Sequence, residues 1–318
     1  MTMQIGYHAS HEQFSPRDLL RLVQIAEQSG FQSILSSDHF HPWSQQDGQS
    51  GFAWSWLGAA MHATTMEFGI VNAPGQRYHP AIIAQAVATL DNMFPGRFWI
   101  ALGSGQALNE QITGTGWPSK ELRHKRLEAC ADVMRRLWKG ENVTRHDDIR
   151  VQDAQLYTRP SCQPTVYGAA LTVSTATWVG TWADGLITVN QDIPTLQAII
   201  DGFRQHNPNG KLILKLQVSY NSSVETAVTS AWQAWRNNTL GHMLQADLPL
   251  PQQYDAAGIH ITPRHVAQQV LAATDPSVYV DAIRRYKQMG FNKIILHNVN
   301  REQDSFLAFM GREVLPSI

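Results

Sequence analysis

The stretch Ser33-Ile34-Leu35-Ser36-Ser37-Asp38-His39-Phe40-His41-Pro42-Trp43 decides the fold of this chain, because a short apolar run ends here and polar and aromatic side chains follow at once. The same change occurs where residues 67–71 run into Asn72-Ala73-Pro74-Gly75, and again where residues 98–102 run into Gly103-Ser104-Gly105-Gln106. Several strands that carry polar groups at their C-terminal ends are typical of the active face of a (β/α)8 barrel. The sequence therefore predicts an α/β fold of that kind, a TIM barrel with insertions.

Strand and helix patterns alternate along the whole chain. Residues 16–30 place apolar side chains at helical spacing, with a proline early and a glycine at the stop. The predicted strands are short and apolar on both faces, which suits a parallel sheet covered by helices. We expect strands at 4–9, 33–39, 66–73, 97–105, 165–170, 185–190, 211–219 and 293–297. We expect helices at 16–30, 52–64, 80–94, 118–140, 174–183, 193–206, 224–235, 278–289 and 303–314. These elements predict one domain over residues 1–318.

Two segments interrupt this repeat. Residues 141–160 alternate apolar and polar side chains, as a small β-hairpin insertion would. Residues 237–263 are irregular and rich in Leu, Pro, Gln and Asp. A loop of that length in a compact domain is usually a functional lid or a disordered segment, so we expect this one to lie over the site.

Composition excludes several classes of partner. The formal net charge is -1 and no basic stripe is interleaved with aromatic residues, so nucleic acid and acidic lipid are not expected partners. The first residues show no basic segment followed by an apolar one, and no apolar run is long enough to span a bilayer. Cys130 and Cys162 lack the neighbours of a disulfide framework and are expected to be free thiols. We expect a cytoplasmic protein.

The thirteen histidines raise the possibility of a metal-dependent hydrolase. His39 and His41 are alternate residues leaving a strand, and His8, His79 and His297 lie near other strand ends. However, no H-E-x-x-H motif and no zinc-type cysteine spacing accompanies them. We therefore predict no metal.

The glycine-rich end of the fourth predicted strand suits neither a nucleophile elbow nor a dinucleotide loop. The first motif needs glycine where Leu102 and Gln106 stand, and the second needs glycine where Leu108 stands. A flat ligand could approach the backbone at residues 103–105, with Gln106 and Asn109 supplying amide groups for the edge of a flavin-like ring. Trp43 would cover a face of the ring. The alternative makes Asn109 a helix cap and Trp43 a packing residue.

Four segments of the chain resemble one protein family. They are Gly6-Tyr7-His8-Ala9-Ser10-His11-Glu12-Gln13-Phe14, Ser37-Asp38-His39-Phe40-His41-Pro42-Trp43, Arg77-Tyr78-His79-Pro80 and Gly103-Ser104-Gly105-Gln106-Ala107-Leu108-Asn109-Glu110. The chain is similar to the luciferase-like flavin and deazaflavin oxidoreductases, and among them to the F420-dependent glucose-6-phosphate dehydrogenases. The resemblance covers nearly the whole chain and implies a bacterial luciferase-like barrel. It also implies a homodimer, with helices two and three as the usual contact.

The resemblance nominates site residues. It implies that His39 handles a proton of the substrate and that Trp43 helps to hold the reaction centre, while Asp38 orients His39 or holds the strand end. The expected substrate contacts are Glu12, His8 and Trp43. The expected cofactor contacts are Asp38, Val71, Asn72, Gly105, Gln106, Asn109, Ala169, Ala170, Thr172, Ser174 and Thr175, of which the last three would meet the cofactor phosphate at a helix start.

Three departures from the dehydrogenase pattern stand out. Gln106 stands where those relatives have a glutamate proposed as a proton donor, and an amide does not donate a proton as an acid does. The stretches 189–192 and 267–269 contain no basic side chain to bind a sugar phosphate. The expected glycine-rich phosphate turn reads Ala169-Ala170-Leu171-Thr172-Val173-Ser174-Thr175. These departures favour a subgroup of flavin enzymes that does not use F420.

The sequence thus predicts a flavin-dependent oxidoreductase, a luciferase-like monooxygenase that uses reduced FMN on a small organic substrate. A flavin reductase would be the partner that supplies the reduced flavin. Two alternatives stay open. One is an F420-dependent dehydrogenase that performs hydride transfer, and the other is a non-catalytic flavin-binding protein.

Overall fold

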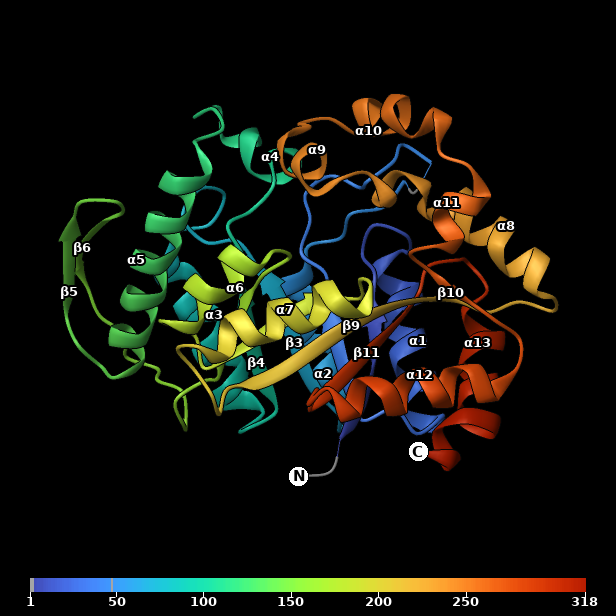
Figure 1. Ribbon diagram of the computed structural model, residues 1–318. Helices are drawn as coiled ribbons and strands as arrows, with labels where there is room; N and C mark the ends of the chain where they lie inside the picture. The colour runs from blue at the N-terminus through green and yellow to red at the C-terminus, as the bar shows by residue number, and fades with distance from the viewer. Residues whose placement is uncertain (1–2, 47) are drawn as a thin grey trace.

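The computed structural model describes residues 3–46 and 48–318, so residues 1, 2 and 47 of the predicted domain lie outside the described residues. Its main feature is a parallel barrel of eight strands in the order β9-β11-β1-β2-β3-β4-β7-β8, closed by pairing of β8 with β9 (Figure 1). A two-residue strand, β10, pairs with Val218 and Ser219 at the end of β9, beyond the residues that pair with β8. The predicted (β/α)8 fold is confirmed.

The strands that form the barrel follow the predicted order. They are β1 (Gln4–Ala9), β2 (Ser33–Ser36), β3 (Glu67–Asn72), β4 (Phe98–Leu102), β7 (Val166–Ala169), β8 (Gly185–Val189), β9 (Lys211–Ser219) and β11 (Lys293–Asn298), with β10 at Leu271–Ala272. Several strands end earlier than predicted. The pairing of β2 with β1 stops at the pair Ala9 and Ser36, so Asp38 and His39 lie beyond the ladder, in the turn that leaves it.

Helices cover the outside of the barrel. They are α1 (Pro16–Gln28), α2 (Ala53–Ala63), α3 (Pro80–Met93), α5 (Lys120–Trp138), α6 (Val173–Gly180), α7 (Ile193–Arg204), α8 (Val224–Trp235), α12 (Pro276–Gln288) and α13 (Gln303–Phe309). The short helix α4 (Ala107–Glu110) lies instead at the C-terminal end of the barrel, after β4 (Figure 1). Prolines occupy the first turn of α1, α3, α7 and α12, where a missing backbone N–H costs little. In the described residues, no helix is both long enough and apolar enough to cross a membrane.

Two apolar layers hold the barrel. The larger layer lies between the strands and the surrounding helices, and the smaller fills the barrel interior. The interior layer consists of Leu35, Trp99, Ala101, Tyr167, Ile187, Ile213 and Ile295. Because side chains alternate along a strand, the residues two positions after these reach the C-terminal mouth of the barrel, where polar groups can face a cavity.

The two insertions take different forms. The first contains the antiparallel pair β5 (Val143–His146) and β6 (Arg150–Ala154), which lies outside α5 (Figure 1). The second insertion was expected to be irregular, but it contains the short helices α9 (His242–Asp247) and α10 (Pro251–Ala257). A third short helix, α11 (Pro263–Ala267), begins where the insertion ends. Pro251 and Pro263 open two of them and Thr262 caps the last. These helices lie over the mouth of the barrel (Figure 1), and we refer to residues 236–267 as the lid.

The lid is anchored through one carboxylate. Asp255 accepts hydrogen bonds from the Ser44 hydroxyl at 2.6 Å, the Gln45 backbone N–H at 3.1 Å and the Asn237 amide at 2.7 Å. Beside these bonds, a separate apolar cluster joins the lid to the barrel and includes Trp43 and Tyr254. The loop after β2 and the lid are therefore packed as one unit.

Candidate active site

A cavity of about 1350 Å³ occupies the C-terminal mouth of the barrel, beneath the lid. Its walls come from the ends of β1 to β4 and β7 to β9, and from the lid between Asn238 and Asp247. Cavities that bury a drug-sized ligand measure about 300–1000 Å³. This one has room for a large flat ligand and a small molecule together.

His39 and Glu12 form the central pair of the site. The Nδ1 atom of His39 lies 2.9 Å from the Oε1 atom of Glu12, whose side chain is 3% exposed. The hydroxyls of Ser10 and Ser37 donate to the other carboxylate oxygen of Glu12, at 2.8 and 2.9 Å. Burial alone would raise the pKa of Glu12, but the close contact with the His39 imidazole holds that pKa well below its usual range. Glu12 is thus an anion that fixes one ring nitrogen of His39 and leaves Nε2 as the second proton site.

Trp43 links this pair to the lid. Its ring lies edge-on to that of His39 at 4.9 Å and to that of Tyr254 at 5.4 Å, measured between ring centroids. The side chain is buried but lines the cavity. Trp43 therefore lines the cavity and packs against the lid at the same time. The two roles that the sequence offered for it, a cover for a ligand and a packing residue, are compatible.

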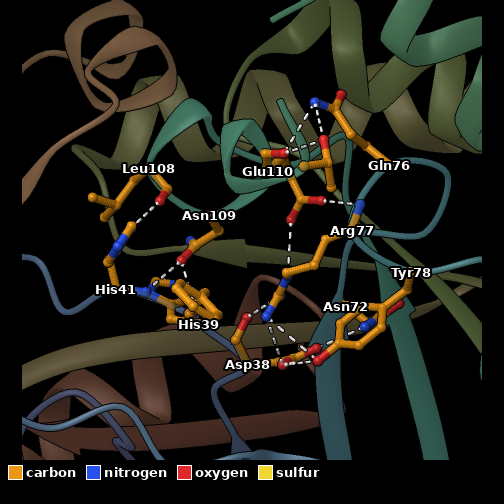
Figure 2. Close-up of polar contacts among 12 residues, drawn as sticks. Asp38, His39, His41, Asn72, Gln76, Arg77, Tyr78, Leu108, Asn109 and Glu110 are labelled. Atoms are coloured by element: carbon orange, nitrogen blue, oxygen red, sulfur yellow. Dashed lines mark hydrogen bonds and ion pairs between the residues drawn. The ribbon is translucent and has the colours of Figure 1, made fainter. Parts of the chain in front are cut away.

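The Asp38 carboxylate does not face His39. It accepts from the Asn72 amide at 2.7 Å and from the Tyr78 hydroxyl at 3.0 Å, and it lies 3.5 Å from Nη1 of Arg77 (Figure 2). Of the two roles that the resemblance implied, these contacts fit the holding of the strand end. Glu12, which was expected to contact substrate, is the acid that orients His39.

Arg77 extends this network to the fourth strand end. Its Nε lies 3.4 Å from Oε1 of Glu110, its backbone N–H donates to Glu110 at 2.9 Å, and Nη2 donates to the Asp38 carbonyl at 2.9 Å (Figure 2). Burial raises the pKa of Glu110, and Arg77 opposes that rise. Arg77, Tyr78 and Glu110 were not among the predicted site residues, although they lie within the segments that carry the resemblance.

The fourth strand end has the predicted shape. Gly105 has φ +78°, and a Cβ atom there would come within 2.8 Å of Cγ of Glu110, so a side chain is excluded for two reasons. Gln106 and Val71 line the cavity. Asn109 does too, but its Oδ1 accepts the backbone N–H groups of Phe40 and His41, at 2.8 and 3.2 Å.

Two expectations for this strand end therefore change. Asn109 lies inside α4, whose N-cap is Gln106, so the reading of Asn109 as a helix cap is wrong. Its carbonyl oxygen holds the loop that carries His39, which leaves only the amide nitrogen for a ligand edge. The Oδ1 atom of Asn72, a residue that lines the cavity, is a buried acceptor without a partner among the described residues.

The predicted phosphate turn forms a helix start. Ala169, Ala170, Thr172 and Thr175 line the cavity, and the Thr172 hydroxyl accepts from the Thr175 N–H as the N-cap of α6. Ser174 is exposed and lies outside the cavity lining, so it does not reach the site as predicted. The free N–H groups of the first turn of α6 suit an anion such as a phosphate.

The wall opposite this turn carries nitrogen groups. His8 on β1 and His297 on β11 have ring centroids 4.3 Å apart, and the His297 Nε2 atom lies 3.1 Å from the Gln13 side-chain oxygen. Burial, helped by the charge of Lys215, lowers the pKa of both histidines well below the usual range, so both are neutral. Lys215 of β9 lines the cavity beside them and was not predicted. In the described residues, no group of three or more metal-binding side chains comes together.

Comparison with known proteins agrees with this geometry. Residues 2–293 match the family described as luciferase-like monooxygenase. The chain belongs to the luciferase-like monooxygenase family. The resemblance inferred from the four sequence segments is thus confirmed at the level of the family, and the protein is a luciferase-like oxidoreductase.

Relatives of this luciferase-like protein use deazaflavin. The F420-dependent glucose-6-phosphate dehydrogenase of Microbacterium testaceum (strain StLB037) is 32% identical over 329 residues, which cover 99% of this chain and 97% of the relative. A protein of the same name from Nakamurella multipartita is also 32% identical, over 99% of this chain and 96% of its own. The structure of an F420-dependent secondary alcohol dehydrogenase in complex with an F420-acetone adduct has a TM-score of 0.92 and 31% identity, and the match covers 100% of this chain and 99% of that one.

Proposed function

We propose that this luciferase-like protein is an F420-dependent dehydrogenase that oxidises a secondary alcohol to a ketone by hydride transfer. The observation that carries the reaction is the pair of His39 and Glu12 at the cavity, with Nδ1 of His39 held at 2.9 Å by a buried anion. The likeness to F420-dependent dehydrogenases over almost the full chain supports the choice of cofactor.

The residues present fit such a cofactor. Gly105 gives a backbone surface without a side chain, Asn72 offers an unpaired acceptor, and the start of α6 offers N–H groups for a phosphate. A bound F420 would supply the hydride acceptor. Asp38 would keep Asn72 and the strand end in place, and Trp43 would close the cavity under the lid.

Proton transfer falls to the chain itself. When the alcohol carbon gives up its hydride, the hydroxyl proton must leave the oxygen, and Nε2 of His39 is the acceptor. The resulting imidazolium is stabilised by Glu12, whose carboxylate is already ionised and fixed by Ser10 and Ser37. In the reverse direction the same nitrogen returns the proton to a ketone.

One experiment separates the cofactors. The purified protein is titrated with F420 and with FMN, and thermal unfolding and fluorescence report which ligand binds. We expect a rise in Tm with F420, because a ligand that binds only the folded state stabilises it. F420 reduction is then followed with propan-2-ol. His39→Ala should abolish turnover while F420 binding is kept.

Reduced FMN with monooxygenation is the second candidate, because Gln106 lines the cavity where the dehydrogenases are expected to carry a glutamate. It would involve a flavin reductase as partner. FMN binding without F420 binding, together with oxygen uptake in the presence of reduced FMN, would favour this candidate. A ligand that binds but is never turned over by any substrate would instead favour the non-catalytic flavin-binding protein.

A further inference from the structure

Lys215 occupies a boundary position in β9. It pairs with Ile295 of β11 and Val189 of β8. Ile213, two residues earlier, belongs to the apolar layer of the barrel interior, and Gln217, two residues later, lines the cavity. Since side chains at alternate positions share a face, Lys215 points into the barrel at the level where the apolar layer gives way to the cavity.

The Lys215 ammonium has no partner of opposite charge. No hydrogen bond or ion pair in residues 3–46 and 48–318 reaches it, and the centroid of the Trp235 ring lies 5.7 Å from its Nζ. Burial lowers the pKa of Lys215 to about 8, against an opposing effect of Glu12. The side chain is therefore still a cation at neutral pH. A partly buried cation at a cavity wall, with no carboxylate among the described residues to pair with it, is a strong binding group for an anion.

The neighbours of Lys215 leave that role open. Glu12 already interacts with His39, Ser10 and Ser37 and does not lie within ion-pair distance of the lysine. His8 and His297 are neutral on the grounds given above. Trp235 gives an apolar face beside the ammonium, and that face excludes water from an anion bound there.

We propose that Lys215 determines specificity in this cavity by binding the carboxylate of a small hydroxy acid whose hydroxyl lies at His39. The inference rests on the proposed dehydrogenase function and narrows its substrate class. It also fits the absence of basic residues in 189–192 and 267–269, because Lys215 places a cation on β9, close to the barrel interior, although other basic side chains line the outer part of the wall.

The position of Lys215 favours substrate over cofactor. The groups that fit the cofactor lie at the ends of β3, β4 and β7, in Asn72, Gly105 and the turn before α6. Lys215 lies on the other half of the mouth, where β9, β11 and β1 are neighbours: His297 is on β11, His8 is on β1 and Glu12 follows β1. The same half carries Trp235 from the end of α8.

The test uses two unreactive probes of equal shape, isobutyrate and isobutyramide, bound to the protein with F420 and measured by calorimetry. The wild type should bind the carboxylate about 10- to 100-fold more tightly than the amide, the range expected for a hydrogen bond to a charged group. Lys215→Met should remove this preference and leave isobutyramide affinity and F420 affinity unchanged. Lys215→Arg should keep part of the preference for isobutyrate over isobutyramide. Lys211→Met, at the exposed start of the same strand, is the control and should change nothing.

Turnover of lactate and propan-2-ol completes the test. The wild type should prefer lactate in kcat/KM, and Lys215→Met should lose that preference. Equal binding of the two probes by the wild type would overturn the inference, even if propan-2-ol were oxidised and the dehydrogenase function upheld. A loss of F420 affinity in Lys215→Met would also overturn it, because the lysine would then bind cofactor. Isobutyrate binding that depends on Lys215 without any alcohol turnover would support the anion site and count against the dehydrogenase.

Discussion

Glu12 and His39 lie in direct contact although they follow different strands, with Oε1 of the carboxylate 2.9 Å from Nδ1 of the imidazole. The contact forms because β1 and β2 are parallel neighbours whose pairing ends together at Ala9 and Ser36. The two chain segments leave the sheet side by side. A buried acid is thereby aimed at a histidine, and only one ring nitrogen is left for the substrate.

Glu12→Gln should lower turnover while the fold is kept. The amide can still accept from Ser10 and Ser37, but it no longer stabilises an imidazolium at position 39. We expect kcat to fall by about 10²-fold, the lower end of what a positioned acid or base contributes. Steady-state kinetics over a pH series should also show a changed profile. Glu141→Gln removes the partner of Arg136 at the surface and is the control; an equal fall in both variants would contradict the role of Glu12.

Asp38→Asn should destabilise the protein strongly. The change removes one of the two carboxylates beside Arg77, whose side chain is 9% exposed, and it takes the charged acceptor away from Asn72 and Tyr78. We expect a loss of about 3–5 kcal/mol in the free energy of unfolding, measured by urea denaturation. Asp304→Asn breaks the exposed pair with Arg21 and should cost at most about 1 kcal/mol. Similar losses in the two variants would show that the Asp38 network does not stabilise the mouth.

Gly105→Ala should weaken both the fold and the binding of cofactor. The new Cβ would be strained at φ +78° and would also come within 2.8 Å of Glu110. Gly114→Ala is a matched control, since its φ is +75° and nothing lies within 4 Å of a Cβ there. We expect a cost of about 1 kcal/mol at Gly114 from backbone strain, and a clearly larger one at Gly105. Equal changes in Tm would mean that the contact with Glu110 is easily relieved.

Stability should fall as the pH drops below about 6.5. Burial lowers the pKa of His11 to about 4 and that of His8 and His297 well below the usual range. At a pH between these lowered pKa values and the ordinary pKa of histidine, the three imidazoles bind protons in the unfolded chain but not in the folded one. Each such histidine then contributes a slope of about 1.4 kcal/mol per pH unit, with stability rising as pH rises.

Urea unfolding between pH 5 and 8 measures this slope. His11→Asn should reduce it, because the imidazole beside Trp56 is removed. His146→Asn changes an exposed histidine of the hairpin and should leave the slope as it is. A slope that is unaffected by His11→Asn would contradict the assignment of His11 as a buried neutral group.

We propose that the protein is a homodimer in which α3 contributes to the contact. Ile82 and Met93 are 58% and 55% exposed on that helix, and Phe52 before α2 is 57% exposed. In a dimer that uses α3, these side chains would be removed from water, and contiguous apolar patches are typical of interaction surfaces. Sedimentation should show a dimer, and the double change Ile82→Glu and Met93→Glu should give a monomer. Met243→Glu, which alters an apolar side chain on the lid that is 82% exposed, should leave the dimer intact.

The barrel could be predicted from the sequence because its signals are local. Each apolar strand and each helix with an early proline can be recognised from its own residues, without knowledge of the other elements. The polar residues that follow the strands indicate the active face. The lid helices could not be predicted, since stretches such as 242–247 and 251–257 are too short to show helical periodicity.

The candidate site was only partly predictable for a related reason. His39, Trp43, Gly105 and Thr172 stand in segments that the resemblance marks, and the structure brings them to one cavity. Pairings between segments are different, because no local pattern indicates that Glu12 rather than Asp38 faces His39. Lys215 was missed since a single lysine inside the run Leu212-Ile213-Leu214-Lys215-Leu216 reads as an ordinary buried strand.

The anchor at Asp255 has a consequence for engineering and divergence. This carboxylate accepts hydrogen bonds from Ser44 and Gln45, in the loop that carries His39. A lid taken from another barrel would therefore need an acceptor of its own for the Ser44 hydroxyl and the Gln45 N–H. Conversely, exchange of residues 236–267 with Asp255 retained would alter what enters the mouth and leave the strand ends on the opposite half untouched. New preferences for small molecules could then arise by replacing one segment of the chain, without rebuilding the half of the barrel that carries Asn72, Gly105 and the start of α6.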